Sequence, residues 1–162
     1  MRPLSFVLTI ALAATLGGSA LAGGPPQVGQ PAPGFTAPLA SGGNLSLSSL
    51  RGKAVYLNFF ASWCPPCNEE APDVNALQKK YAKRGLVVVG VDELENAAKA
   101  NGFLKKYGLV YKAVVDSGTL RDEYGTNALP VHVFISRNGK VKLYREGEMS
   151  KTEIESAIKS IL

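Results

Sequence analysis

Apolar residues recur along the chain with two different periods, and the alternation of these periods predicts the order of its elements. Residues 54–61 and 86–91 are nearly continuous apolar runs, as expected of strands buried on both faces. Between them, residues 65–84 carry apolar side chains at spacings of three and four, which predicts a helix. Gly85 is expected to end this helix, and Pro72 inside it predicts a kink.

The second half of the chain repeats the alternation and closes with a hairpin and a helix. Asp92 is predicted to be the N-cap of a helix that runs to Tyr107, with Glu95 completing a capping box. A strand, a short helix, two strands joined by a tight turn and an amphipathic helix are then expected at residues 111–115, 120–124, 131–136, 140–145 and 152–162. This order predicts an α/β fold, with a central mixed sheet flanked by helices.

The N-terminal part of the chain is expected to lie outside the main body. Residues 1–22 combine Arg2, an apolar segment and a small-residue cleavage site at Ala20-Leu21-Ala22, the pattern of a secretory signal peptide. An uncleaved membrane anchor is the alternative, since a bilayer is spanned by roughly 20 apolar residues. Either way, the body is expected in the periplasm or at the outer face of the cytoplasmic membrane. Residues 23–34 predict a flexible leader, and residues 35–162 a folded domain that begins with a short hairpin.

Charge and cysteine content narrow the classes of function. The formal net charge is +5, but the basic residues are scattered rather than gathered in a run, which argues against nucleic-acid binding. The chain has two cysteines, Cys64 and Cys67, so it has no framework of structural disulfides. Structural zinc takes four ligands, and beyond these cysteines the chain offers the single His132. No metal and no cofactor are expected, and a redox-active cysteine pair remains.

The pair lies in Trp63-Cys64-Pro65-Pro66-Cys67, directly after a predicted buried strand and at the start of a predicted helix. The free N–H groups of a helix N-terminus stabilise a thiolate, so Cys64 is expected to be the exposed, attacking thiol. Cys67, one turn later, is expected to be buried and to resolve the mixed disulfide. The pattern predicts a thiol–disulfide oxidoreductase.

Further segments form a recognisable set with the cysteine motif: Gly29-x-x-Ala32-Pro33-x-Phe35, Leu57 to Cys67, Pro72, Tyr124-Gly125, Leu129-Pro130 and Phe134 to Val141. Through these segments, residues 28–162 resemble the thioredoxin-like superfamily, and more narrowly the TlpA/ResA type of exported thiol–disulfide oxidoreductase. The resemblance implies a thioredoxin-like fold with an N-terminal hairpin and a central helix–strand insertion, for which residues 94–115 are suited.

The resemblance also implies roles for single residues. Pro130 matches the family's cis-proline, and Leu129 before it is expected to present its backbone to the client. Trp63 is expected either to pack on the client or to cap the core. Asn58 stands where cytoplasmic thioredoxins carry a buried aspartate, and Glu93 is expected to supply the carboxylate near the dithiol. The alternative for Glu93 is an acid of a helix first turn.

His132 is expected to be a packed core histidine, with an acid–base or metal role as the alternative.

The residues around the cysteines favour reduction of clients over oxidation. Pro65 and Pro66 lack an N–H, and Glu69 and Glu70 follow closely, so a Cys64 thiolate is expected to be poorly stabilised. Such a disulfide is weakly oxidising, nearer thioredoxin at about −270 mV than DsbA at about −120 mV. The expected activity is that of a protein-disulfide reductase.

The resemblance implies partners for a monomeric reductant outside the cytoplasm. The expected client is an exported disulfide-bearing protein, apocytochrome c in cytochrome c biogenesis or a copper-site protein, and a membrane electron donor is expected to reduce the cysteine pair again. Two alternatives stay open. One is a copper-binding assembly chaperone that uses Cys64, Cys67 and His132. The other is a disulfide oxidase or isomerase on the same fold.

Overall fold

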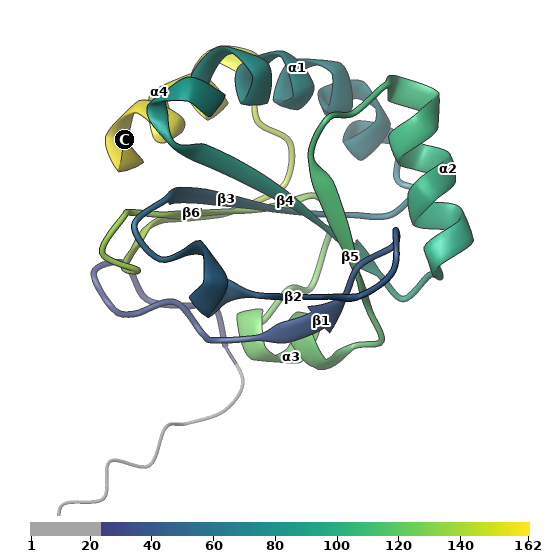
Figure 1. Ribbon diagram of the computed structural model, residues 1–162, viewed down its shortest axis with the longest axis horizontal. Coiled ribbons are helices and arrows are strands. Elements are labelled where there is room, and N and C mark those ends of the chain that lie inside the picture. The colour runs from purple at the N-terminus through teal and green to yellow at the C-terminus, as the bar shows by residue number, and fades with distance from the viewer. Residues whose placement is uncertain (1–23) are drawn as a thin grey trace, which may run out of the picture.

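A five-stranded mixed sheet forms the centre of the computed structural model, which describes residues 24–162 (Figure 1). Its strand order is β5-β4-β3-β6-β7. Strands β3, β4 and β5 are mutually parallel, whereas β6 runs antiparallel to both β3 and β7. The strands span Ala54–Phe60 (β3), Leu86–Glu93 (β4), Lys112–Asp116 (β5), Val131–Ile135 (β6) and Val141–Glu146 (β7). The predicted fold class is confirmed.

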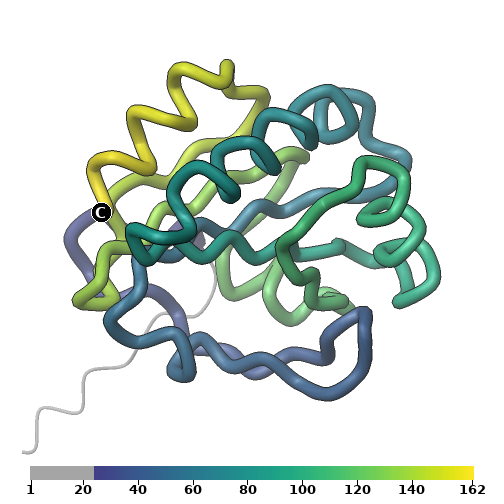
Figure 2. The backbone as a smooth tube through the Cα atoms, turned by 45° about the horizontal axis from the view of Figure 1, so that its top comes forward, coloured from purple at the N-terminus to yellow at the C-terminus, as the bar shows by residue number. Residues whose placement is uncertain are grey.

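Helices cover the sheet on both faces (Figures 1 and 2). Helices α1 and α4 pack side by side on one face, and α2 lies beside them at the β5 edge. The short helix α3 and the two-stranded β1–β2 hairpin cover the opposite face. The elements span Pro65–Tyr81 (α1), Ala97–Tyr107 (α2), Thr119–Tyr124 (α3), Lys151–Ile161 (α4), Thr36–Pro38 (β1) and Asn44–Ser46 (β2), with short 3-10 helices at Leu47–Leu50 and Ala82–Arg84.

Strand periodicity separates the core into two sides. Along β3, Tyr56 packs toward α1 and α4, whereas its neighbours Val55 and Leu57 pack toward the hairpin and α3. Near the end of β3, Phe60 stacks on Phe103 of α2, with ring centroids 4.5 Å apart. This contact belongs to an apolar cluster that includes both cysteines, so the redox pair lies where β3, α1 and α2 meet.

One predicted helix start is wrong. Asp92 does not cap a helix, because β4 continues through Asp92 and Glu93, which remain paired with β5. Helix α2 begins at Ala97, and its N-cap is Asn96, whose side chain accepts the Lys99 N–H. Pairing with a neighbouring strand therefore extends the sheet beyond the point at which local capping signals predict its end.

The predicted leader makes backbone hydrogen bonds to the body in its second half. Gly29 N–H donates to Val141 O, and Ala32 N–H donates to Gly139 O. The hydroxyl of Tyr124 donates to Pro33 O at 2.7 Å. The predicted signal peptide or anchor lies outside the described residues. Among the helices of residues 24–162, none has the length and apolar character needed to cross a bilayer.

Candidate active site

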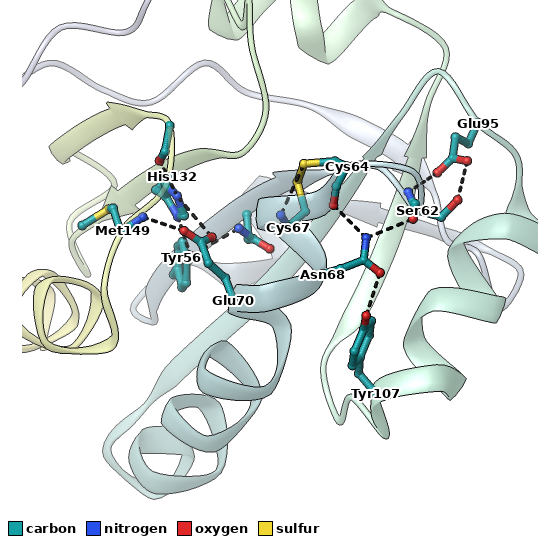
Figure 3. The surroundings of a disulfide bond; sticks show 12 residues. Tyr56, Ser62, Cys64, Cys67, Asn68, Glu70, Glu95, Tyr107, His132 and Met149 are labelled. Atoms are coloured by element: carbon teal, nitrogen blue, oxygen red, sulfur yellow. Dashed lines mark hydrogen bonds and ion pairs between the residues drawn. A yellow bond between two sulfur atoms is a disulfide. The ribbon is translucent and has the colours of Figure 1, made fainter.

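Cys64 and Cys67 form a disulfide at the N-terminal end of α1 (Figure 3). Cys64 is the N-cap, and its sulfur accepts the Cys67 N–H at 3.3 Å. Cys64 is 2% exposed and Cys67 is 4% exposed. The prediction that Cys64 stands out as the exposed cysteine is therefore wrong for the disulfide form, in which both sulfurs pack in the cluster with Phe60 and Ala71.

Asn68 holds the backbone around the cysteines. Its Nδ2 donates to Cys64 O at 2.7 Å and to Ser62 O at 3.0 Å. Its Oδ1 accepts the Tyr107 hydroxyl at 2.7 Å and the Lys106 ammonium at 3.0 Å, so α2 supports the same side chain (Figure 3). Sequence reasoning missed Asn68, because the donors to its Oδ1 lie on an element almost forty residues away.

Two acids, Asp92 near the end of β4 and Glu95 just after it, lie near the loop that precedes Cys64. Glu95 accepts both the N–H and the hydroxyl of Ser62. Burial raises the pKa of Glu95, but the two Ser62 hydrogen bonds, together with the neighbouring Asp92 and Lys99, hold the pKa below its usual range. Asp92 is fully buried, and within residues 24–162 its oxygens have no hydrogen-bond donor. Burial, and then the neighbouring Glu95, raise the pKa of Asp92 to about 8, so Asp92 is largely protonated at neutral pH.

Glu93 points to the other face of the sheet. It is 6% exposed, and its Oε1 accepts the hydroxyl of Thr126. Burial raises its pKa, while the Thr126 hydroxyl and Arg121 oppose the rise. Thr126 begins the segment that leads to Leu129 and Pro130, so the structure connects Glu93 to this segment rather than to α1.

The Leu129–Pro130 peptide bond is cis, as the resemblance implied. Leu129 packs against the cluster that contains both cysteines. Trp63 is 69% exposed, so its ring does not cap the core. The exposed indole of Trp63, which precedes Cys64, and the cis-proline segment therefore both lie next to the disulfide.

A second polar group lies on the other side of the disulfide from Asn68 in Figure 3. Glu70, one turn after Cys67, is 6% exposed, and its Oε1 accepts the Met149 N–H. Burial raises the pKa of Glu70 to about 7. Sequence reasoning treated Glu70 only as a nearby charge, although its spacing of three from Cys67 and four from Val74 could have placed it on the buried side of the helix.

His132 is the core residue that the sequence predicts. It is fully buried, and burial lowers its pKa to about 4, so the ring is neutral. Its Nδ1 lies 2.7 Å from the Tyr56 hydroxyl, and its Nε2 lies 3.1 Å from Gly147 O. Glu70 Oε2 is 3.5 Å from the same Nε2, which with a neutral ring is a polar contact and no ion pair. In the part of the chain that is described, no group of three or more His, Cys, Asp or Glu side chains is arranged to hold a metal ion.

A buried strand, a C-x-x-C disulfide at the start of the following helix and a cis-proline segment beside it define the thioredoxin-like class of thiol–disulfide oxidoreductases. The profile of the AhpC/TSA family matches residues 28–144. The thiol-disulfide oxidoreductase ResA of Bacillus thuringiensis (strain Al Hakam) is 35% identical over 136 residues, which cover 83% of this chain and 79% of that protein. The chain therefore belongs to the AhpC/TSA family, and within it to the ResA-like thiol–disulfide oxidoreductases.

Solved structures agree with this assignment. A Chlorobium tepidum protein described as a candidate thiol:disulfide interchange protein DsbE has a TM-score of 0.77 and 34% identity, covering 84% of this chain and 98% of its own. A secreted Mycobacterium tuberculosis disulfide oxidoreductase, described as homologous to E. coli DsbE, has a TM-score of 0.71 and 28% identity. It is covered over 95% of its length and covers 78% of this chain.

Proposed function

We propose that this protein reduces disulfides in exported proteins, with Cys64 as the attacking thiol and Cys67 as the resolving thiol. The Cys64 thiolate attacks one sulfur of the client disulfide and forms a mixed disulfide, releasing the other client sulfur as a thiolate. The Cys67 thiolate then attacks Cys64 Sγ, which forms the Cys64–Cys67 disulfide and releases the second client thiolate. Two electrons thus pass to the client, and the oxidised pair must be reduced again by a dithiol donor.

The observation that carries the direction of electron flow is the small number of donors at Cys64. Its sulfur accepts one backbone N–H, from Cys67, because Pro65 and Pro66 have none to donate. A thiolate with few donors has a higher pKa and is a poorer leaving group, so the disulfide is harder to reduce and the dithiol is the better reductant.

Export and partners belong to the same proposal. The signal-peptide pattern of residues 1–22 supports a periplasmic or membrane-facing location, and so does the likeness to a secreted Mycobacterium tuberculosis oxidoreductase. Residues 23–34 would then connect the exported domain to the cleavage site or to an anchor. A reductant in an oxidising compartment needs a membrane electron donor. Apocytochrome c or a copper-site protein is the proposed client, and a monomer is the proposed working form.

The reduction potential of the Cys64–Cys67 pair tests the direction. We expect a value near that of thioredoxin, about −270 mV, in equilibrium with glutathione or a dithiol buffer. A value near −120 mV, typical of DsbA, would instead indicate an oxidase.

Trapping of the client tests the roles of the two cysteines. Cys67→Ser should hold clients as mixed disulfides that dithiothreitol releases, whereas Cys64→Ser should hold far fewer. The two variants differ only in which of the two cysteines keeps its thiol. Equal trapping by both variants would contradict the assigned roles, and tight Cu(I) binding by wild type without any trapping would favour a copper chaperone.

Glu93 remains the proposed base that takes the proton of Cys67, and the burial of Glu70 makes it a second candidate. Both side chains are buried carboxyls with raised pKa values, and they lie on opposite faces of the sheet. Glu93→Gln and Glu70→Gln are therefore a matched pair, since each keeps shape and removes one titration. The variant that loses an inflection in the pH profile of thiol alkylation identifies the base.

A further inference from the structure

The hydrogen bonds around His132 define which ring nitrogen carries its proton. Gly147 O lies 3.1 Å from Nε2, and a carbonyl oxygen can only accept, so Nε2 is the nitrogen that donates. Since burial keeps the ring neutral, Nδ1 is then an acceptor. The Tyr56 hydroxyl, 2.7 Å from Nδ1, supplies the matching proton.

Tyr56 is itself oriented by its neighbour on β3. Asn58 Nδ2 donates to the Tyr56 oxygen at 3.3 Å, so the hydroxyl proton is directed toward His132. Burial, with the nearby Glu70 charge, raises the pKa of Tyr56 well above its usual value, and the proton stays on the hydroxyl. The donors therefore run in one direction, from Asn58 to Tyr56 to His132, and the last N–H donates to Gly147 O. Glu70 lies beside this N–H, with Oε2 3.5 Å from Nε2 (Figure 3).

One carboxylate oxygen of Glu70 lacks a hydrogen-bond donor from the residues that the structure describes. Its Oε1 accepts the Met149 N–H, but among residues 24–162 its Oε2 has no hydrogen bond within normal distance. The His132 Nε2–H, which donates to Gly147 O, lies 3.5 Å away and can be shared with Oε2. A buried carboxylate oxygen without a donor is costly, and a small approach of the two side chains would supply one.

We propose that Tyr56 and His132 are positioning residues of the redox site, which hold an N–H at Glu70 Oε2 and so set the pH range over which Glu70 exchanges a proton with the dithiol. This inference rests on the proposed function and on Glu70 as a proton carrier. When a dithiol donor passes two electrons to the Cys64–Cys67 disulfide, protonated Glu70 gives its proton to a nascent thiolate. The Glu70 carboxylate that forms is then stabilised by the Met149 N–H and the His132 Nε2–H.

The other charged and titratable groups around the pair come from several elements. Tyr111, before β5, and Glu148, after β7, face Glu70, and Arg145 on β7 faces His132. Glu148 opposes ionisation of Glu70, and Arg145 opposes protonation of His132. Both effects keep the ring neutral and the carboxyl titrating near neutral pH.

Removing the hydroxyl and the imidazole together tests the proposal without leaving a Tyr56 hydroxyl or a His132 Nδ1 that lacks the other. In Tyr56→Phe/His132→Phe, the Glu70-dependent inflection in the pH profile of thiol alkylation should move upward by about one pH unit, because Oε2 loses its donor. Tyr56→Phe alone should move it less, in the same direction, since a hydrogen bond into Nδ1 strengthens donation from Nε2.

Tyr111→Phe is the matched control. Tyr111 is also a buried tyrosine near Glu70, but within the described part of the chain its hydroxyl has no hydrogen-bond partner. The same substitution there should leave the inflection in place. An equal shift in Tyr111→Phe would mean that the loss of any nearby polar group has this effect, which would overturn the proposal. An unmoved inflection in the double variant would also overturn it.

Two further measurements keep the proposal falsifiable if the variants fold poorly. Imidazole nitrogen shifts of the wild-type protein should report the Nε2–H tautomer between about pH 5 and 9, and an Nδ1–H tautomer would overturn the proposal. In a Glu70→Gln background, Tyr56→Phe should cause no shift, and a shift that persists there would also overturn it. The proposed reductase function is judged separately, by the reduction potential and by trapping with Cys67→Ser.

Discussion

On the face of the sheet that packs against α1, the central strands bury four polar side chains: Tyr56, Asn58, Asp92 and His132. On the opposite face, the same strands bury only apolar side chains at their centre: Val55, Leu57, Phe59, Val89, Val91, Val131, Val133 and Ile135. Glu93 at the end of β4 is the point at which this apolar face meets a polar group, Thr126.

The two faces of the central strands contribute differently to the free energy of folding. An apolar face stabilises by removing hydrocarbon from water, whereas buried polar groups cost free energy unless they are hydrogen-bonded. At the centres of these strands the buried polar groups lie on the face that carries the disulfide, where burial raises the pKa values of Glu70 and Asp92. On the other face, the buried Glu93 lies only at the strand end, where Thr126 donates to it. At their centres, the same three strands thus carry an apolar core on one side and buried polar groups on the other.

The largest expected effect is a loss of stability caused by a substitution in the apolar face. Phe59 is fully buried there, with its ring 5.4 Å from that of Tyr124. Phe59→Ala should lower the free energy of unfolding by about 3–5 kcal/mol, because it removes a buried ring and leaves a cavity. Urea unfolding measures the loss. The pH profile of thiol alkylation in the folded protein should not change, and a changed profile would show that the two faces are not separate.

An intermediate effect concerns the buried acid of the polar face. The pKa of Asp92 is raised from its ordinary 3.8 to about 8, so the folded state binds its proton more tightly than the unfolded state does. This contribution to stability is present at low pH and is lost as the pH rises through 3.8 to about 8. Asp92→Asn does not titrate, so it should lack this loss and be more stable than wild type at pH 9, by several kcal/mol.

Urea midpoints measured between pH 5 and 9 give the comparison for Asp92→Asn. Glu123→Gln, which removes an exposed acid, serves as the control and should follow wild type. Parallel pH curves for Asp92→Asn and wild type would mean that Asp92 is ionised in the folded state.

The smallest expected effect concerns the N-cap of α4, a helix on the same side of the sheet as the disulfide but without a role in the redox reaction. Ser150 caps α4 in a capping box with Glu153. Ser150→Ala should cost about 1 kcal/mol in the free energy of unfolding and leave the reduction potential unchanged. A changed potential would show that the polar face acts as one unit, rather than only where Glu70 and His132 approach the disulfide.

Local patterns determined much of the architecture. The apolar runs of β3 and β4 and the period of α1 were visible in the sequence, because burial on both faces and a helix stripe leave signals within a few residues. The C-x-x-C at a strand–helix junction predicted the disulfide site. The signal failed at Asp92, where a good capping residue remains in the strand because β5 supplies hydrogen-bond partners.

The sequence by itself therefore determined the order of the elements, the cysteine pair and the kind of chemistry it performs, since each depends on neighbours along the chain. Only the tertiary structure decided which polar groups meet. Tyr56 and His132 are 76 residues apart, and they touch because β6 pairs with β3 in one register. Glu70 joins them because α1 lies across that face of the sheet. Such contacts follow from sheet order and helix placement, which are global results of packing and leave no mark in local periodicity.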